Sequence, residues 1–247
     1  MLSKAKIKYI KSLHVKKHRI AENIFLVEGS KSVLEFIRSK FTTDVVYGTD
    51  LFWKQHKKLL TEHNIAFEET TEKELTQAGT LNSNNGAIAL INIPTYTPAE
   101  LDNSKWTIML DVINDPGNLG TIIRVADWYG IDRIILSENS VDMYNPKVVN
   151  TTKGSLARVR VEYGDLTQIL SSFDGVIIGA DMKGEDIHSF KTVNGGVLLM
   201  GSESHGISED LKKLITNQIT IPRVGAAESL NVAVATAIIC DNLCGRK

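Results

Sequence analysis

Residues 106–130 read WTIMLDVINDPGNLGTIIRVADWYG and contain one complete strand–loop–helix unit. The apolar run in 106–113 predicts a buried strand, and the polar, Pro- and Gly-containing segment 114–118 predicts a tight loop. A helix is expected from about Leu119. Working outward from this unit, the same alternation of strand and helix continues to the C-terminus.

Near-continuous apolar runs predict further strands at 133–137, 158–163, 175–181, 196–202 and 218–222. Helical patterns occur at 165–173, 208–216 and from Val232 to Cys240. Apolar strands that alternate with helices imply an α/β domain with a mostly parallel sheet and helices on both faces. Ligands bind at the carboxyl ends of the strands in such sheets, which directs attention to the loops that follow them.

The front of the chain is organised differently. Strands are expected at 24–29, 44–48, 65–69 and 86–93, and helices at 5–13, 30–40 and 52–63, with Ser30 as a plausible N-cap. The segment PTYTPAELDNSK, residues 94–105, has no apolar periodicity and is expected to be a linker. The predicted organisation is therefore a smaller α/β domain over 1–93, the linker 94–105 and a second domain over 106–247.

Composition limits the class of protein. The chain has 247 residues, 43% hydrophobic content and a formal net charge of −1. No apolar run is long enough to cross a bilayer and no secretory signal is visible, so a cytoplasmic protein without a membrane partner is expected. Cys240 and Cys244 are expected to be buried or interfacial thiols, and no metal site is expected because they lack further ligands.

The charge is unevenly distributed, because the first twenty residues contain no Asp or Glu. Their basic residues are Lys4, Lys6, Lys8, Lys11, Lys16, Lys17 and Arg19, with His14 and His18. Two interpretations remain open at this point: a solvated helix face, or a surface that binds phosphates.

Three loops at strand ends carry the candidate chemistry. After the first loop, Arg124 is close enough to reach back, and its planar guanidinium suits a phosphate or carboxylate. The alternative is a surface ion pair with Asp127, three residues further on. The second loop, VLLMGSESHGIS (197–208), is bounded by glycines that allow close approach to a small ligand. It matches neither a dinucleotide-binding nor a P-loop fingerprint, and His205 is expected to be an exposed loop residue.

The third loop lies in QITIPRVGAAESLNVAVATAII, residues 218–239. An apolar helix is expected to follow, and three polar residues lie at its N-terminus: Glu228, Ser229 and Asn231. Helix capping explains one such polar residue well, but it explains three less well.

The segments DPGNLGTIIRVAD, GSESHGIS and IPRVGAAESLNVAVATAI resemble, in order and spacing, the three motifs of the SpoU or TrmH-type RNA ribose methyltransferases of the SPOUT superfamily. The resemblance covers about residues 106–247. The front segment HRIAENIFLVEGSKSVLEFI resembles the ribosomal-protein-like substrate-binding domain of many members. The resemblance implies a C-terminal α/β domain tied into a deep trefoil knot, a homodimer, and S-adenosylmethionine as cofactor.

Matching residue by residue, the resemblance implies that Gly201, Ile221 and Leu230 line the cofactor pocket. It assigns transfer of the methyl group to a ribose 2′-hydroxyl to Arg124, with Asn118, Glu203, Ser229 and Asn231 shaping the site. Since a guanidinium is a poor base, two roles for Arg124 stay open: it accepts the hydroxyl proton, or it stays charged and positions a phosphate.

The implied substrate is RNA, with ribosomal RNA favoured and Lys16, Lys17 and Arg19 contacting phosphates. Transfer RNA is the nearer alternative. A catalytically idle RNA-binding or ribosome-assembly factor that keeps the knot as a scaffold is a second alternative.

Overall fold

The structure is a computed structural model that describes residues 1–97, 100–191, 193–202 and 205–244. The chain consists of two compact units. The first unit contains Met1–Tyr96 together with Asp142–Ala157, and the second contains Thr97–Val141 and Arg158–Lys247. The sequence-based division places 142–157 in the second domain. Over the described ranges, no helix combines the length and apolar character that a membrane span needs.

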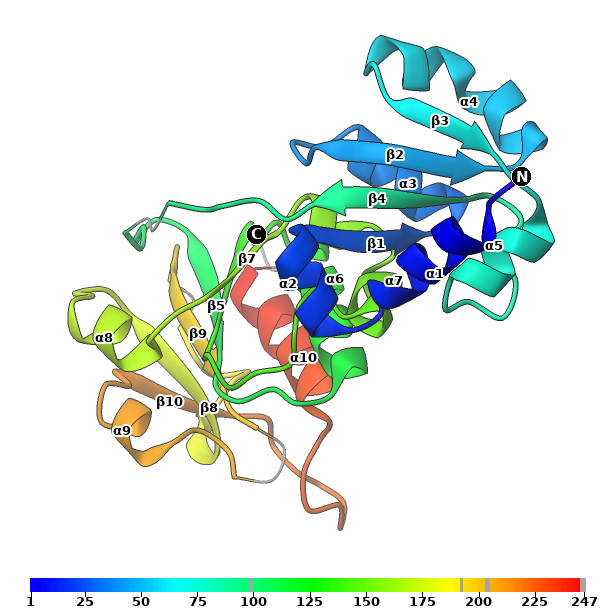
Figure 1. The fold of residues 1–247 in the computed structure, drawn as a ribbon. Coiled ribbons are helices and arrows are strands. Elements are labelled where there is room, and N and C mark those ends of the chain that lie inside the picture. Colours follow the sequence, from blue (N-terminus) through cyan, green and yellow to red (C-terminus); the bar gives the residue numbers. More distant parts are fainter. Residues whose placement is uncertain (98–99, 192, 203–204, 245–247) are drawn as a thin grey trace. The chain divides into compact units, whose positions relative to one another are not determined.

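The first unit is built on a mixed sheet in the order β1-β4-β2-β3 (Figure 1). β4 pairs antiparallel with β1 and β2, and β3 pairs parallel with β2. The strands are β1 (Ile24–Glu28), β2 (Thr43–Gly48), β3 (Ala66–Glu69) and β4 (Ala87–Asn92). The helices are α1 (Lys4–Ser12), α2 (Lys16–Glu22), α3 (Ser30–Ile37), α4 (Asp50–Glu62), α5 (Glu72–Ala78), α7 (Pro146–Thr152) and the 3-10 turn η1 (Ser155–Ala157).

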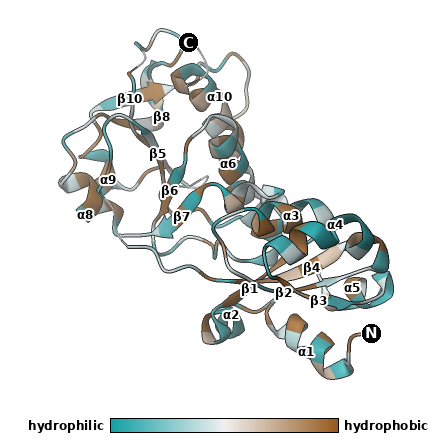
Figure 2. Cartoon of the chain, turned by 90° about the horizontal axis from the view of Figure 1, so that it is seen from above, coloured by the Kyte–Doolittle hydropathy of each residue, from teal (hydrophilic) through white to brown (hydrophobic). Residues whose placement is uncertain are grey.

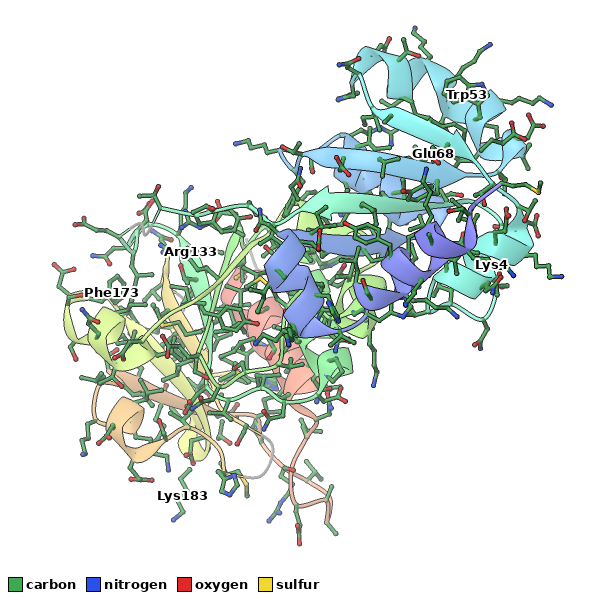
Figure 3. The ribbon with its side chains drawn as sticks, viewed as in Figure 1. Lys4, Trp53, Glu68, Arg133, Phe173 and Lys183 are labelled. Atoms are coloured by element: carbon green, nitrogen blue, oxygen red, sulfur yellow. The ribbon has the colours of Figure 1, made fainter. Side chains whose placement is uncertain are left out.

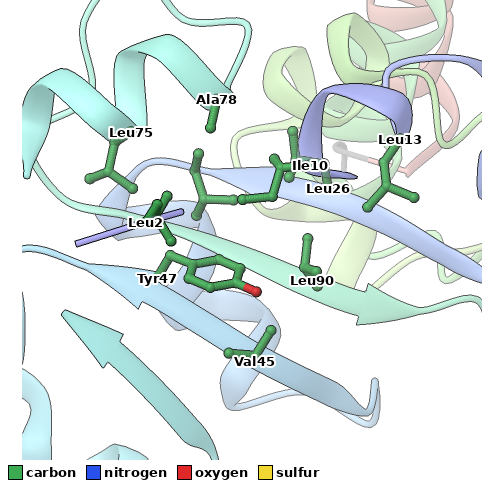
Figure 4. Close-up of a cluster of buried hydrophobic side chains, with 10 residues drawn as sticks. Leu2, Ile10, Leu13, Leu26, Val45, Tyr47, Leu75, Ala78 and Leu90 are labelled. Atoms are coloured by element: carbon green, nitrogen blue, oxygen red, sulfur yellow. The ribbon is translucent and has the colours of Figure 1, made fainter. Parts of the chain in front are cut away.

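Both faces of this sheet are covered, because successive strand side chains point to opposite sides. On one face, Leu26 packs in a buried cluster with side chains from α1 and α5 (Figure 4). On the other face, Phe25 contacts Phe36 of α3 with ring centroids 5.6 Å apart, and Tyr144 at 4.5 Å. Since Tyr144 belongs to Asp142–Ala157, this segment completes the core of the first unit.

The second unit contains a fully parallel sheet in the order β10-β8-β9-β5-β6-β7. Its strands are β5 (Trp106–Leu110), β6 (Arg133–Leu136), β7 (Arg160–Tyr163), β8 (Ile177–Asp186), β9 (Gly196–Met200) and β10 (Asn217–Thr220). Its helices are α6 (Pro116–Trp128), α8 (Leu166–Ser171), α9 (Glu209–Lys212) and α10 (Val232–Cys244). This confirms the α/β class and the mostly parallel sheet.

Helices cover both faces of the second sheet. Met109 and Leu199 pack in one buried cluster with Leu166 of α8 and Leu211 of α9. Their strand neighbours point the other way, towards the side where α6 and α10 pack against each other. Figure 2 shows the strands of this unit between α8 and α9 on one side and α6 and α10 on the other.

Three local expectations need correction. α6 begins at Pro116 rather than near Leu119, because Asp115 caps it and proline is favoured at a first helical position. The N-cap of α3 is Gly29, with φ +85°, so Ser30 is its first helical residue. The sequence patterns also missed α2, α5 and α7, which are all short.

Candidate active site

The first loop is fixed by the start of α6. The side chain of Asp115 accepts a hydrogen bond from the backbone N–H of Asn118 at 2.8 Å, which satisfies one free donor of the first turn. Asn118 therefore lies within the helix and not in a free loop. Its side-chain oxygen faces Asn231, whose Nδ2 donates to it at 2.9 Å.

Of the three polar residues at the start of α10, Asn231 has a clear structural role. Its Oδ1 accepts from the backbone N–H groups of Ala233 and Val234, at 3.0 and 3.3 Å, so it is the N-terminal cap of the helix. The same amide donates to Asn118 and joins the first loop to the third. Ser229 and Glu228 lie before the helix, are exposed, and take no part in this cap.

The second loop follows β9. The backbones of Ser202 and Gly206 exchange two hydrogen bonds, at 3.0 and 2.9 Å. A Cβ on Gly201 would lie 2.0 Å from the backbone of Gly206, so only glycine allows this close approach. His205 is exposed, as expected, and Glu203 lies outside the described residues.

Asp111 links the first and second loops, and the sequence patterns did not single it out. The Asp111 carboxylate is buried and accepts from the backbone N–H of Ser208 at 2.8 Å. Its own N–H donates to Met200 at 2.9 Å, at the end of the neighbouring strand. An acidic residue at the end of an apolar strand is the signal that could have identified it, because a buried carboxylate needs donors.

Arg124 lies on α6 and is exposed. The predicted alternative, an ion pair with Asp127, is not found: Arg158 binds that carboxylate through Nε at 2.9 Å and Nη2 at 2.7 Å. Within the described part of the chain, no hydrogen bond or ion pair engages Arg124. Its guanidinium is therefore available to an anionic ligand, and it lies on the same helix as Asn118.

The proposed pocket residues have the chemistry that S-adenosylmethionine requires. Gly201 and Ile221 follow the ends of β9 and β10, and the Leu230 side chain is 47% exposed although it is apolar. Among the described residues, no acceptor is found for the backbone N–H groups of residues 223–230. Apolar side chains beside free backbone donors suit an adenosine, which has an apolar ring face and hydrogen-bonding edges.

The basic front segment divides into exposed and engaged residues. Lys16 and Lys17 of α2 are exposed, and so is Lys4 of α1 (Figure 3). Lys6, by contrast, is paired with Glu68. The expectation that Arg19 contacts phosphates needs correction. Its guanidinium is buried, is paired with the Asp142 carboxylate, and donates to the carbonyl of Leu13 at 2.7 Å.

In the second unit, three loops lie at the carboxyl edge of a parallel sheet. Within the ranges that the structure describes, Arg124 has no ion-pair partner and the exposed backbone N–H groups of 223–230 have no protein acceptor. This is the arrangement of an α/β enzyme that binds its ligand at the strand ends. Residues 105–241 match the SpoU rRNA Methylase family, and residues 4–89 match the MRM3-like substrate binding domain. The chain belongs to the SpoU rRNA methylase family.

Relatives of similar length support this assignment. The chain is 29% identical to the 23S rRNA (guanosine(2553)-2'-O)-methyltransferase RlmP of Bacillus subtilis, covering 97% of this chain and 96% of the relative. It is 33% identical to a TrmH-family RNA methyltransferase structure from Porphyromonas gingivalis, with full coverage of both chains and a TM-score of 0.85. An AdoMet-bound rRNA methyltransferase structure from Sinorhizobium meliloti is 26% identical, with a TM-score of 0.87 over 98% of this chain and 95% of that one. The expected enzyme class, an RNA methyltransferase, is confirmed.

Proposed function

We propose that this chain transfers the methyl group of S-adenosylmethionine to a ribose 2′-hydroxyl of ribosomal RNA. The observation that carries the proposal is the hydrogen bond between Asn118 and Asn231, because it joins the helix that bears Arg124 to the start of α10. The name of the Bacillus subtilis relative and the AdoMet in the Sinorhizobium meliloti structure support the same reaction.

Binding of the methyl donor falls to the loops at the strand ends. When bound, S-adenosylmethionine supplies a methyl group that its positive sulfur has already activated. In the proposed complex, Gly201, Ile221 and Leu230 line the adenosine side, and the backbone of 223–230 donates hydrogen bonds. Asn118, Glu203, Ser229 and Asn231 shape the space for the ribose. The protein's task is therefore mainly alignment.

Arg124 acts in its charged form in this mechanism. The 2′-oxygen forms a bond to the methyl carbon as the carbon–sulfur bond breaks, and the hydroxyl proton leaves to water. An exposed guanidinium stays protonated, so it is a poor proton acceptor. Arg124 instead binds an RNA phosphate and stabilises the negative charge that develops on the 2′-oxygen.

Replacing Arg124 tests this role. Arg124→Ala is expected to lower kcat by about a hundredfold, because stabilisation of the developing charge is lost. Binding of S-adenosylmethionine is expected to be retained, because the proposed role of Arg124 is toward the RNA. Lys213→Ala is the matched control, since Lys213 is an exposed cation on the opposite face that pairs with Asp210. Wild-type kcat in the Arg124 variant would exclude the proposed role.

The substrate is best identified by mapping 2′-O-methyl positions in RNA from cells with and without this protein. A position lost from ribosomal RNA supports the proposal, and one lost from transfer RNA favours the alternative. No lost position would favour an idle RNA-binding factor.

A homodimer is part of the proposal. Two large apolar side chains are exposed on the helices that pack together in the second unit: Trp128 of α6 at 83% and Val234 of α10 at 50%. Burying these two side chains against a second copy of the chain would remove apolar area from water. Light scattering is expected to give twice the chain mass, and a monomeric mass at micromolar concentration would contradict this part.

A further inference from the structure

Val112 has an unusual backbone conformation at the base of the first loop. Its φ is +57°, in the left-handed region that favours glycine. A β-branched residue is an outlier there, because its side chain crowds the backbone. Such conformations persist only where the surroundings enforce them.

Two serine hydroxyls accept hydrogen bonds from the backbone at this point. The Oγ of Ser137 accepts from the backbone N–H of Val112 at 2.8 Å, and the Oγ of Ser140 accepts from that of Ile113 at 3.2 Å. The hydroxyls lie 3.1 Å apart and contact each other. The backbone N–H of Val141 also donates to the carbonyl of Ile113 at 2.8 Å. We call Ser137 and Ser140 the serine clasp.

The clasp lies next to the residues at which α6 begins. Ile113 lies two residues before Asp115, which caps this helix, and Asn118 and Arg124 are both on the helix. At the other side of Val112, Asp111 is held to the second loop through Ser208. A change in the φ of Val112 would therefore rotate the helix start relative to the second loop.

We infer that Ser137 and Ser140 are positioning residues for methyl transfer: they hold Val112 in the left-handed conformation that directs Asn118 and Arg124 into the site. This inference rests on the proposed function for its kinetic readout. The clasp itself has a separate readout, because it predicts protection of two particular amides from solvent exchange.

The test compares Ser137→Ala/Ser140→Ala with the wild-type chain by hydrogen exchange and by methyl-transfer kinetics. Exchange of the Val112 and Ile113 amides is expected to rise by about tenfold or more, because their acceptors are removed. In the same variant kcat is expected to fall by about ten- to a hundredfold, because small displacements of aligned groups are costly. Binding of S-adenosylmethionine, measured by calorimetry, is expected to change by less than about twofold. The clasp follows β6, whereas the proposed pocket residues Gly201 and Ile221 follow β9 and β10.

Val112→Gly supplies the decisive second variant. Glycine adopts positive φ without a clasp, so adding it to the double variant is expected to restore a large part of kcat. Ser137→Thr/Ser140→Thr keeps both hydroxyls, so it is expected to keep the Val112 and Ile113 amides protected from exchange. Ser171→Ala, which changes an exposed serine of α8, is the control.

Unchanged amide exchange in the alanine variant would overturn the inference, whether or not the wild type methylates RNA. A loss of kcat that Val112→Gly does not restore would overturn it as well. A wild-type chain that methylates no RNA while the exchange pattern changes as expected would instead refute the proposed function.

Discussion

The side-chain amide of Asn231 serves two roles with its two ends. Its oxygen caps α10, and its nitrogen donates to Asn118. Capping concerns stability, whereas the contact with Asn118 concerns the geometry of the site. A suitable pair of substitutions separates the two.

Asn231→Ser is expected to keep the stability and lose activity. Serine is a good N-cap, but its side chain is too short to reach Asn118, so kcat should fall by about tenfold or more while the melting temperature stays close to that of the wild type. Asn231→Ala should lose activity and also about 1 kcal/mol of stability, because the cap is removed. Thermal melting and a methyl-transfer assay measure both effects, and equal melting temperatures for the two variants would contradict the capping role.

Cys244 gives the chain a predictable response to alkaline pH. Burial raises the pKa of its thiol from 9.0 to about 11, because the thiolate is poorly solvated there. The protonated thiol contributes fully to the free energy of unfolding while the pH is below its pKa in the unfolded chain, about 9. This contribution is lost as the pH rises from about 9 to about 11. Cys244→Ser is therefore expected to lose less stability than the wild type over this window, as urea unfolding at pH 8 and 10.5 would show. Parallel losses in both chains would contradict the burial of this thiol.

At the scale of the element, the strands were predictable because their apolar runs form near-continuous segments. The start of α6 was not, because Asp115, Pro116 and Gly117 have the composition of a turn, and the same residues serve as a cap and a first helical turn. The meeting of Asn118 with Asn231 followed from the family resemblance. Composition could not predict it, because the two residues are 113 positions apart.

The burial of Arg19 on α2 is a second feature that the local sequence could not predict. A cation in a lysine-rich segment is typical of a surface residue, and nothing near it in the sequence indicates otherwise. Its partner Asp142 is 123 positions away and belongs to the segment that completes the first unit. The segment Asp142–Ala157 therefore explains why Arg19 is buried, although the local sequence pattern predicts an exposed residue.

Removing the partner of Arg19 is expected to be costly. Asp142→Ala would leave a guanidinium that is only 2% exposed without its carboxylate, and the free energy of unfolding should fall by about 3 kcal/mol. Asp132→Ala is the control, because Asp132 forms an exposed pair with Lys105 and should cost less than about 1 kcal/mol. Urea unfolding measures both, and equal losses would argue against a structural role for the buried pair.

At the scale of the whole molecule, the net charge of −1 conceals a basic front surface. The exposed Lys16 and Lys17 are proposed to contact RNA phosphates, which release counterions when they are neutralised. Lys16→Gln/Lys17→Gln is therefore expected to weaken RNA binding and to lower the slope of log K against log salt by about 2. Lys57→Gln/Lys58→Gln on α4 is the matched control, since both of its lysines are exposed as well. Equal slopes for the two variants would place the RNA contact elsewhere.

The division of the chain into units has a consequence for its biosynthesis. The first unit needs Asp142–Ala157 to cover Phe25 and to neutralise Arg19, so it is incomplete when Tyr96 leaves the ribosome. About 60 further residues must follow, which takes on the order of several seconds at about 5–20 residues per second. During that interval the nascent front half lacks one aromatic neighbour of Phe25 and the carboxylate partner of Arg19. Chaperones that shield early chains therefore have a defined window in which to act on this protein.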